Sequence, residues 1–241
     1  LEKRKNVLKL KSFFKEDDTI FFVAARAPAK NHKDYLYNLR ICKNIILALE
    51  KIKISHLIYL SSDAVYSDID KKIHENSPTK PKNYHGLMHL KRENLIKKKF
   101  GNVLTIVRPT LIYGIKDPHN GYGPNKFMRL AKKNKKIEIF GKGEELRDHV
   151  YIDDVSNIIK KIIFYKNFGI YNIASGKVVS FLNIANQCIK MSKSKSKILR
   201  LDRKINKLPH NGYRPFDIKK LKKLINKNKI TQLDTGIRKL Y

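Results

Sequence analysis

Cysteine is scarce in this 241-residue sequence, and long hydrophobic runs are absent. The two cysteines, Cys42 and Cys188, each fall inside an apolar helical pattern. This predicts buried thiols in a reducing compartment, the cytoplasm, rather than a disulfide framework. No apolar run approaches the roughly 18 residues needed to span a bilayer, and no signal peptide is recognisable. These absences predict a protein that does not associate with membranes. Because the chain begins at Leu1 rather than methionine, we expect it to be a piece of a longer protein.

Acidic residues are few, and so are arginines. The chain has 53 lysines and arginines against 21 aspartates and glutamates, a formal net charge of +32, yet only 11 of the basic residues are arginine. Hydrogen bonding to base edges and bidentate contacts with phosphate groups both favour arginine. The lysines are spread along the chain without interleaved aromatics. This favours a solvated surface over a nucleic-acid interface, so we expect no specific nucleic acid as partner. The charge would still attract anionic substrates.

The first half of the chain alternates buried strands with amphipathic helices. Short apolar runs rich in β-branched and aromatic residues predict strands at residues 19–25, 56–62 and 103–107. After the first strand, apolar residues recur at three and four positions and predict a helix. Its expected buried stripe is Leu36, Leu39, Cys42, Ile45, Ile46 and Leu49. Near-continuous apolar strands that alternate with helices are typical of a parallel sheet covered on both faces.

The second half has a looser pattern. Residues 137–154 predict two short strands around a turn, and residues 169–175 predict another strand. Apolar periodicity predicts amphipathic helices that include residues 155–163 and 181–189. A lysine-rich helix is expected at residues 217–228. The fold class expected from both halves is α/β.

Five segments occur in a recognisable order: "IYLSSDAVYSD", "YHGLMHLKRE", "VRPTLIYG", "GKGEELRDHVYIDDV" and "GIYNIASG". Together they resemble the extended short-chain dehydrogenases/reductases, in the group of NAD-dependent epimerases/dehydratases. The resemblance runs from about residue 18 to about residue 221. It implies a partial doubly wound parallel, Rossmann-like sheet with a small C-terminal α/β substrate domain.

The glycine-rich turn of that family is missing here. In the family it follows the first strand and meets the cofactor pyrophosphate at a helix N-terminus. "GYGPN" and "GKGEEL" have paired glycines but lack the third glycine and the strand-to-helix context. We therefore expect residues 1–118 to form the second half of an NAD(P)-binding domain. Residues 119–241 would form mostly the substrate-binding region, with some segments returning to the sheet.

The helix that carries the family's acid-base pair is altered. The family pattern is Tyr followed by Gly, with Lys four and Glu eight residues after the Tyr. Counting from Tyr84 does not reproduce it, whereas counting from His85 places Gly86 next, His89 at the lysine position and Glu93 at the glutamate position. A histidine titrates near 6.5 and exchanges protons at neutral pH without a lysine to lower its pKa. We expect His85 as the acid-base group and His89 as a support for the cofactor.

Three other interpretations of this helix stay open. His85, His89 and Glu93 are all metal-ligand types, but eight helical residues span about 12 Å, which is too far for one ion to meet all three easily. The helix could be a degenerate one that only packs. Tyr84 could act if the alignment is shifted by one residue.

The resemblance assigns further roles by position. Ser62, at the end of a predicted strand, would orient the sugar oxygen that is oxidised, because a hydroxyl both donates and accepts. Arg147 would bind the substrate pyrophosphate through its guanidinium fork. The residues implied for cofactor binding are Ala24, Ala25, Asn38, Ser61, His89, Pro109 and Thr110. Those implied for substrate binding are Asp63, Asn125, Phe127 and Arg147.

The implied activity is hydride transfer at a carbon of a nucleotide-activated sugar, with NAD or NADP as cofactor. Such enzymes commonly serve polysaccharide biosynthesis, and the resemblance leaves a homodimer open. Ala64 stands where sugar 4,6-dehydratases have a glutamate after the aspartate, which argues against elimination chemistry. Leu111 stands where nucleotide-sugar enzymes often have asparagine, which leaves the substrate undefined. The alternative function is a non-catalytic Rossmann-like protein that binds a nucleotide or sugar through a degenerate site.

Overall fold

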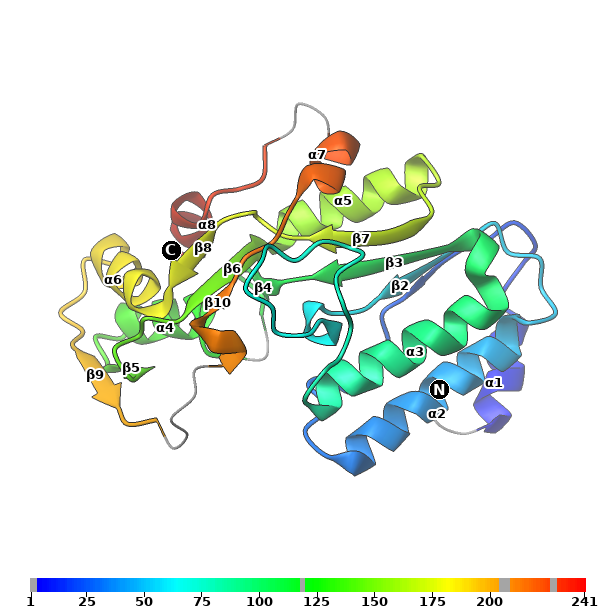
Figure 1. Cartoon of the computed structure of the whole chain (residues 1–241), viewed down its shortest axis with the longest axis horizontal. Helices are drawn as coiled ribbons and strands as arrows, with labels where there is room; N and C mark the ends of the chain where they lie inside the picture. Colours follow the sequence, from blue (N-terminus) through cyan, green and yellow to red (C-terminus); the bar gives the residue numbers. More distant parts are fainter. Residues whose placement is uncertain (1–3, 118–119, 204–208, 226–228) are drawn as a thin grey trace. The chain divides into compact units, whose positions relative to one another are not determined.

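The computed structural model describes residues 4–117, 120–203, 209–225 and 229–241 (Figure 1). Its described residues group into two compact units. Unit 1 comprises those of Leu1–Ser67, Glu75–Pro109 and Ile159–Asn172, and unit 2 comprises those of Asp68–His74, Thr110–Ile158 and Ile173–Tyr241. The domain division expected at residue 118 stays a prediction, because a unit defined by contacts is not a separately folding domain.

Unit 1 is built on one sheet with the strand order β1-β2-β3-β7. These strands are β1 (Thr19–Phe22), β2 (His56–Leu60), β3 (Leu104–Pro109) and β7 (Gly169–Ile173), and β1, β2 and β3 run parallel. The helices are α1 (Arg4–Lys11), α2 (His32–Leu49) and α3 (Tyr84–Phe100), with the 3-10 turns η1 (Asp63–Val65) and η2 (Gly101–Val103). Helices α2 and α3 pack side by side (Figure 1). The predicted α/β class and parallel sheet are confirmed.

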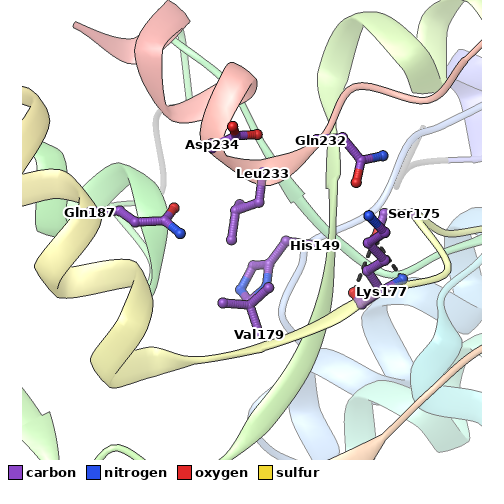
Figure 2. A pocket seen from close by; sticks show the side chains of 8 residues that line it. All are labelled: His149, Ser175, Lys177, Val179, Gln187, Gln232, Leu233 and Asp234. Carbon is purple, nitrogen blue, oxygen red and sulfur yellow. Dashed lines mark hydrogen bonds between the residues drawn. The ribbon is translucent and has the colours of Figure 1, made fainter.

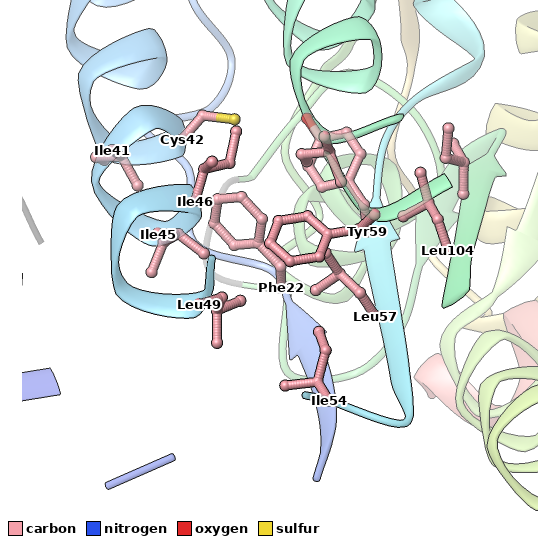
Figure 3. Packing of buried hydrophobic residues seen from close by; sticks show 13 residues of the cluster. Phe22, Ile41, Cys42, Ile45, Ile46, Leu49, Ile54, Leu57, Tyr59 and Leu104 are labelled. Carbon is pink, nitrogen blue, oxygen red and sulfur yellow. The ribbon is translucent and has the colours of Figure 1, made fainter. Parts of the chain in front are cut away.

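The core of unit 1 lies between this sheet and its helices. Phe22 and Tyr59 pack with ring centroids 5.5 Å apart, beside the buried side chains of α2 (Figure 3). Two details differ from the sequence expectation. Leu36 of the predicted stripe is 47% exposed. The first strand stops at Phe22 rather than continuing to Ala25, because the following segment bonds to side chains of α2 and α3 instead of to a strand.

Unit 2 contains two small sheets. In the first, β6 (Leu146–Tyr151) pairs with β4 (Leu111–Tyr113), β8 (Val178–Ser180) and β10 (Tyr213–Arg214), and in the second β5 (Ile137–Phe140) pairs with β9 (Ile198–Leu201). The remaining elements are α4 (Pro124–Lys132), α6 (Phe181–Met191), η3 (Pro209–Gly212), α7 (Lys219–Ile225) and α8 (Leu233–Leu240). The two strands predicted within residues 137–154 are present as β5 and β6, which pair with different partners.

Helix α5 (Ile152–Phe164) begins in unit 2 and ends in unit 1. The core of unit 2 is formed by residues of α4, α6, α8 and the strands around them, including Phe127, Ile139 and Phe181. The lysine-rich helix expected at residues 217–228 is present as α7 up to Ile225, and its last three expected residues lie outside the described part. Among the described residues, no helix has both the length and the apolar character required to cross a membrane.

Candidate active site

The carboxyl end of β2 carries two serines with different environments. Ser61 is buried; its amide donates to the Val107 carbonyl at 2.8 Å, and its hydroxyl donates to Glu93 Oε1 at 2.5 Å. Ser62 is half-buried and caps η1, where its Oγ accepts from the Ala64 amide at 3.2 Å. Of the two hydroxyls, Ser61 is therefore held by a carboxylate, while Ser62 lies nearer to solvent at the strand end.

A buried ion pair anchors this strand end to α3. Arg108 of β3 donates to both Glu93 oxygens, from Nε at 3.0 Å and from Nη2 at 2.6 Å, and both side chains are at most 4% exposed. Bidentate geometry and the added Ser61 hydrogen bond satisfy the carboxylate, which a buried charge needs. Glu93 thus serves to fix α3 against β2 and β3.

The first turn of α3 lies directly against η1. Asn83 caps the helix by accepting from the Gly86 amide at 2.8 Å. A Cβ on Gly86 would lie 2.2 Å from the Ala64 carbonyl oxygen and 2.6 Å from Pro81 Cβ, so only glycine allows this approach. This close packing brings Asp63 near His85. The negative charge of Asp63 therefore acts to raise the pKa of the His85 imidazole.

His85 and His89 form a pair on one face of α3. Their rings meet edge to face with centroids 4.7 Å apart. His89 is buried, and its Nδ1 lies 2.8 Å from the Tyr59 hydroxyl, which fixes the ring orientation. Burial, with the charges of His85 and Arg92, holds the pKa of His89 well below its usual value. Burial also lowers the pKa of His85, whose Nδ1 is buried without a hydrogen-bond partner in the described part of the chain.

Both imidazoles are therefore neutral at pH 7, and each can donate and accept. Tyr84, the alternative acid-base group, is 40% exposed, and its ring contacts His32 and Tyr35 of α2. This arrangement favours the alignment that starts at His85, in which His85 faces η1. The metal alternative finds no support in Glu93, because both of its oxygens are bound by Arg108 and Ser61.

Arg92 is a cation that the sequence interpretation overlooked. It is fully buried and lies over the rings of Phe22 and Tyr59, at 4.5 and 5.0 Å from their centroids. It donates to the Ala24 carbonyl at 2.8 Å and to the Met88 sulfur at 3.6 Å. It forms no ion pair with any described residue, and its charge lies close enough to His89 to disfavour protonation there.

The segment after β1 is held in place by Asn38. This buried side chain accepts from the Arg26 amide at 2.8 Å and donates to the carbonyls of Arg26 and Asp34. Arg92 of α3 donates to the Ala24 carbonyl, so the segment is held by side chains from both α2 and α3. Ala25 is exposed and Ala24 is half-buried beside them. Asn38 thus positions the predicted cofactor-binding segment, and its amide makes three protein hydrogen bonds.

Two predicted cofactor-binding residues lie where β3 ends: Pro109 is the last residue of unit 1 there, and Thr110 belongs to unit 2. Pro109 is the last residue of β3, and the Thr110 hydroxyl donates to Asp148 at 3.1 Å. Asp148 also accepts from the amides of Ser175 and Gly176, each at 2.8 Å. Burial raises the pKa of Asp148 to about 6, although these hydrogen bonds act to lower it. Thr110 and Asp148 together hold the turn after β7.

The predicted substrate residues of unit 2 are partly engaged by protein. Arg147 contacts Glu145 Oε1 through Nη2 at 2.5 Å and Nε at 2.6 Å, and it lies opposite Arg214 in the β6–β10 pairing. Asn125 is buried and accepts from the Gly114 amide at 3.3 Å. Phe127 is fully buried in the core of unit 2. Their contacts with substrate stay predictions.

The site roles of Ser61, Ser62, His85 and His89 stay predictions, and the sequence analysis did not single out Tyr59 and Arg92, which contact or lie near His89. A signal existed for Arg92, which is a charged residue on the apolar side of a helix between Met88 and Ile96. Tyr59 carried none, because a tyrosine in a buried strand usually serves packing.

Comparison with known proteins decides the family. The family model described as NAD dependent epimerase/dehydratase matches residues 3–174. The chain belongs to this family. The dTDP-D-glucose 4,6-dehydratase of Dictyostelium discoideum is 30% identical over 172 residues, covering 65% of this chain and 38% of that protein. The uncharacterized UDP-glucose epimerase YtcB of Bacillus subtilis is 26% identical over 242 residues, covering 95% of this chain and 74% of that protein. The chain thus spans well under half of the first relative's length.

Solved structures of epimerases share the fold. The UDP-glucose 4-epimerase of Thermus thermophilus, in complex with NAD, superposes with a TM-score of 0.86 at 19% identity, over 98% of this chain and 80% of that chain. The UDP-glucuronic acid 4-epimerase of Bacillus cereus, in complex with UDP-glucuronic acid and NAD, gives 0.85 at 22% identity, over 100% and 79%. The Rossmann-like α/β fold expected from the epimerase/dehydratase resemblance is confirmed.

Proposed function

We propose that the protein to which this chain belongs is an NAD-dependent epimerase or oxidoreductase that acts on a nucleotide-activated sugar. The observation that carries the proposal is the His85–His89 pair, which lies against η1 at the carboxyl end of β2 in a member of this family. In open α/β sheets, ligands bind outside the carboxyl ends of the strands. Family relatives include sugar-nucleotide epimerases and dehydratases, and structural neighbours hold NAD.

The residues of unit 1 fit one half of the cofactor. Ala24, Ala25, Ser61 and Pro109 lie at or just after the carboxyl ends of three neighbouring parallel strands. These ends would hold the nicotinamide side, with His89 donating to a hydroxyl of the ribose. Glycine first occurs at Gly86, so the turn that binds the pyrophosphate is not formed by these residues. When bound, NAD accepts and returns a hydride.

The chain's own residues would remove and return the proton of the sugar hydroxyl. Ser62 orients the sugar hydroxyl, and neutral His85 takes its proton as the carbinol carbon loses a hydride, which leaves a ketone and a positively charged His85. Epimerisation would require a hydride to be delivered to the opposite face of the ketone, with His85 returning the proton to the oxygen; delivery to the original face would restore the starting sugar. Asp63 beside His85 stabilises the transient positive charge. His89, kept neutral by burial and oriented by Tyr59, positions rather than titrates.

Dehydration is the less favoured reaction for this site. Elimination needs a second carboxyl next to the aspartate, and Ala64 occupies that position. The Ala64 carbonyl is in addition covered by Gly86. We therefore group the protein with the epimerases of its family, although several similar relatives are dTDP-D-glucose 4,6-dehydratases.

The test uses the full-length product of the gene, loaded with NAD and mixed with a panel of UDP-, dTDP- and GDP-sugars. Nicotinamide absorbance and product identity are recorded. We expect conversion of at least one sugar, a loss of about 100-fold or more in kcat for His85→Ala, and little change for Tyr84→Phe. Conversion that survives His85→Ala would refute the assigned role. Tight NAD binding with no conversion would establish the non-catalytic alternative.

A homodimer and a cytoplasmic location belong to the same proposal. Helices α2 and α3 expose large apolar side chains, namely Leu36, Leu47, Tyr84 and Leu87, which supports an interface on these helices. Both cysteines are free and buried, as in a reducing compartment. Sedimentation of the full-length protein and of Leu87→Glu tests the dimer, and cell fractionation tests the location. A monomer at micromolar concentration or a secreted product would contradict them.

A further inference from the structure

His85 and His89 are the same residue type on one face of α3, yet their surroundings differ. In each ring the Nε2 atom has no hydrogen-bond partner among the described residues and is not enclosed. The Nδ1 atom of His85 is enclosed and unpaired, whereas Nδ1 of His89 lies 2.8 Å from the Tyr59 hydroxyl in a buried contact. This contact distinguishes the two imidazoles.

The open Nε2 atoms separate this pair from the polar groups beside the cavity of unit 2. That cavity has a volume of about 170 Å³ and lies between β6, β8, α6 and the start of α8 (Figure 2). The unpaired atoms of its lining, both ring nitrogens of His149 and Gln187 Oε1, are buried and do not face it. The Nε2 atoms of His85 and His89, in contrast, can reach a ligand.

The Tyr59 hydroxyl depends on His89 for its hydrogen bond. Tyr59 is fully buried in the core beside Phe22 (Figure 3), and its hydroxyl has no other partner among the described residues. Burial raises the pKa of this hydroxyl, although the charge of Arg92 acts to lower it, so the O–H keeps its proton at neutral pH. If His89 carried its proton on Nδ1, the tyrosine O–H would be a buried donor without an acceptor.

The favoured arrangement therefore has the Tyr59 O–H donating to an unprotonated Nδ1 of His89. A neutral imidazole carries one proton, which then lies on Nε2. An unpaired buried donor disfavours the other tautomer by about tenfold or more. The doubly protonated ring is disfavoured as well, because burial and the charges of His85 and Arg92 hold the pKa of His89 well below its usual value. The Nε2 of His89 is thus a donor and not a base.

His85 has no such contact on its inner nitrogen. No described residue holds its proton on one nitrogen, so its Nε2 can accept a proton from a ligand. Burial lowers the pKa of His85, and the charge of Asp63 acts in the opposite direction, which favours the protonated ring once it forms. The two histidines therefore suit different tasks.

We propose that Tyr59 is a positioning residue that makes the two histidines unequal. Its hydroxyl fixes the His89 proton on Nε2, so that His89 offers one N–H to a hydroxyl oxygen of the cofactor ribose and leaves His85 as the only base of the pair. The location of the proton stands on the buried contacts of unit 1 alone. The role toward the cofactor rests on the proposed function.

NMR of the full-length protein labelled with ¹⁵N-histidine locates the proton, because a protonated and an unprotonated ring nitrogen differ in ¹⁵N shift. The His89 signals are assigned by their loss in His89→Gln. We expect a protonated Nε2 and an unprotonated Nδ1 in the wild-type protein, and a mixture of tautomers in Tyr59→Phe. Tyr66→Phe is the matched control, since it removes another buried hydroxyl of unit 1, which donates to Asn172 at 2.7 Å. It should leave the His89 tautomer unchanged.

The effect on the cofactor is measured as the Kd of NAD by calorimetry, with kcat at saturating NAD beside it. Tyr59→Phe is expected to weaken NAD binding about tenfold and to change kcat by less than about twofold, because His85 keeps its surroundings. Tyr66→Phe should change neither quantity. A purely structural role of Tyr59 would lower Tm without this split between Kd and kcat.

Three results would overturn the proposal: a proton on Nδ1 of His89 in the wild-type protein, equal tautomer populations in the wild type and Tyr59→Phe, or an NAD Kd that Tyr59→Phe leaves unchanged. If Tyr59→Phe does not fold, 3-fluorotyrosine replaces all tyrosines. Its more acidic hydroxyl should move the His89 Nδ1 signal, and an unmoved signal would overturn the proposal. A wild-type protein that binds no NAD would instead refute the proposed function, and the NMR result would still decide where the proton lies.

Discussion

Glu93 and Arg92 are neighbours on α3, yet their charges are satisfied in different ways. The Glu93 carboxylate receives hydrogen bonds from Arg108 and Ser61. Arg92 has no carboxylate partner among the described residues; its guanidinium lies over the rings of Phe22 and Tyr59 and donates to the Ala24 carbonyl. Cation–π contacts of a desolvated arginine contribute about 2 kcal/mol, less than a buried ion pair loses when one partner is removed. Glu93 is therefore the more sensitive position for stability.

Glu93→Gln should destabilise the protein by about 3–5 kcal/mol, because it leaves Arg108 buried without its counter-charge. The free energy of unfolding from urea titration measures this. The control is Glu138→Gln on the exposed side of β5, which should change stability by less than about 0.5 kcal/mol. A cost below about 1 kcal/mol for Glu93→Gln would mean that Arg108 finds another partner and that the pair does not anchor α3.

Asp148 should make stability depend on pH. Its pKa is about 6 in the folded chain and about 3.9 when unfolded. Between these values only the folded state holds the proton, so this contribution is fully present below about pH 4 and is lost as pH rises through 6. The free energy of unfolding of the wild type minus that of Asp148→Asn should fall by roughly 2–3 kcal/mol from pH 4 to pH 7.

The matched control for this measurement is Asp202→Asn, an exposed carboxyl, for which the same difference should stay flat. A difference for Asp148→Asn that rises with pH would show that the three hydrogen bonds to the carboxylate outweigh its burial, with the pKa lowered rather than raised.

Single residues were predictable where their type is itself the signal. A serine at a strand end and two histidines four apart on a helix stand out in the sequence; all three belong to unit 1, where Ser62 caps η1 and the rings of His85 and His89 are in contact. Their partners were not predictable, since Tyr59 and Arg108 come from other strands and meet α3 only after the sheet has formed.

At the scale of elements, the start of α3 depends on how closely η1 approaches it. Gly86 is inside a helix, where alanine is normally favoured by about 1 kcal/mol. Here the added Cβ would meet backbone, the Ala64 carbonyl oxygen at 2.2 Å. Since backbone yields less readily than a side chain, the steric term should exceed the gain in helix propensity.

Gly86→Ala should therefore lower stability by about 1–3 kcal/mol and move the His85 resonances as η1 shifts. Gly101→Ala is the matched control, because Gly101 has φ −50° and ψ −36° and no atom within 4 Å of a built Cβ. It should stabilise by about 0.4–1 kcal/mol. Thermal melts of both variants measure the contrast, and a stabilised Gly86→Ala would show that η1 moves away freely.

Elements with strong periodicity were predicted well, and their ends were not. The strands β2 and β3 and the helix α2 follow from continuous apolar runs and from spacing. The end of β1 at Phe22 does not, because Val23 and the alanines after it read as strand residues. The Ala24 carbonyl instead accepts a hydrogen bond from Arg92, and the backbone of the following Arg26 is bound by Asn38. These two side chains reach the segment only in the folded unit.

At the scale of the whole molecule, the amino-acid composition determines a large excess of positive charge. A net charge of +32 on 241 residues favours an expanded chain through self-repulsion. The two apolar cores must hold the folded units together against this repulsion. Lysines dominate the excess and lie mostly on the surface, where salt screens them effectively.

Added salt should therefore raise stability. Between about 20 mM and 500 mM NaCl, the Debye length falls from more than 10 Å to less than 8 Å, which removes most repulsion between surface lysines. We expect Tm of the full-length protein to rise by several degrees and then level off, whereas an excluded neutral osmolyte such as sucrose should give a rise without a plateau.

Partial succinylation of surface lysines, which converts positive to negative charge, should flatten the salt dependence. A Tm that falls with NaCl in the unmodified protein would mean that attractive ion pairs, such as Arg129 with Asp117 and Arg203 with Glu144, outweigh the repulsion.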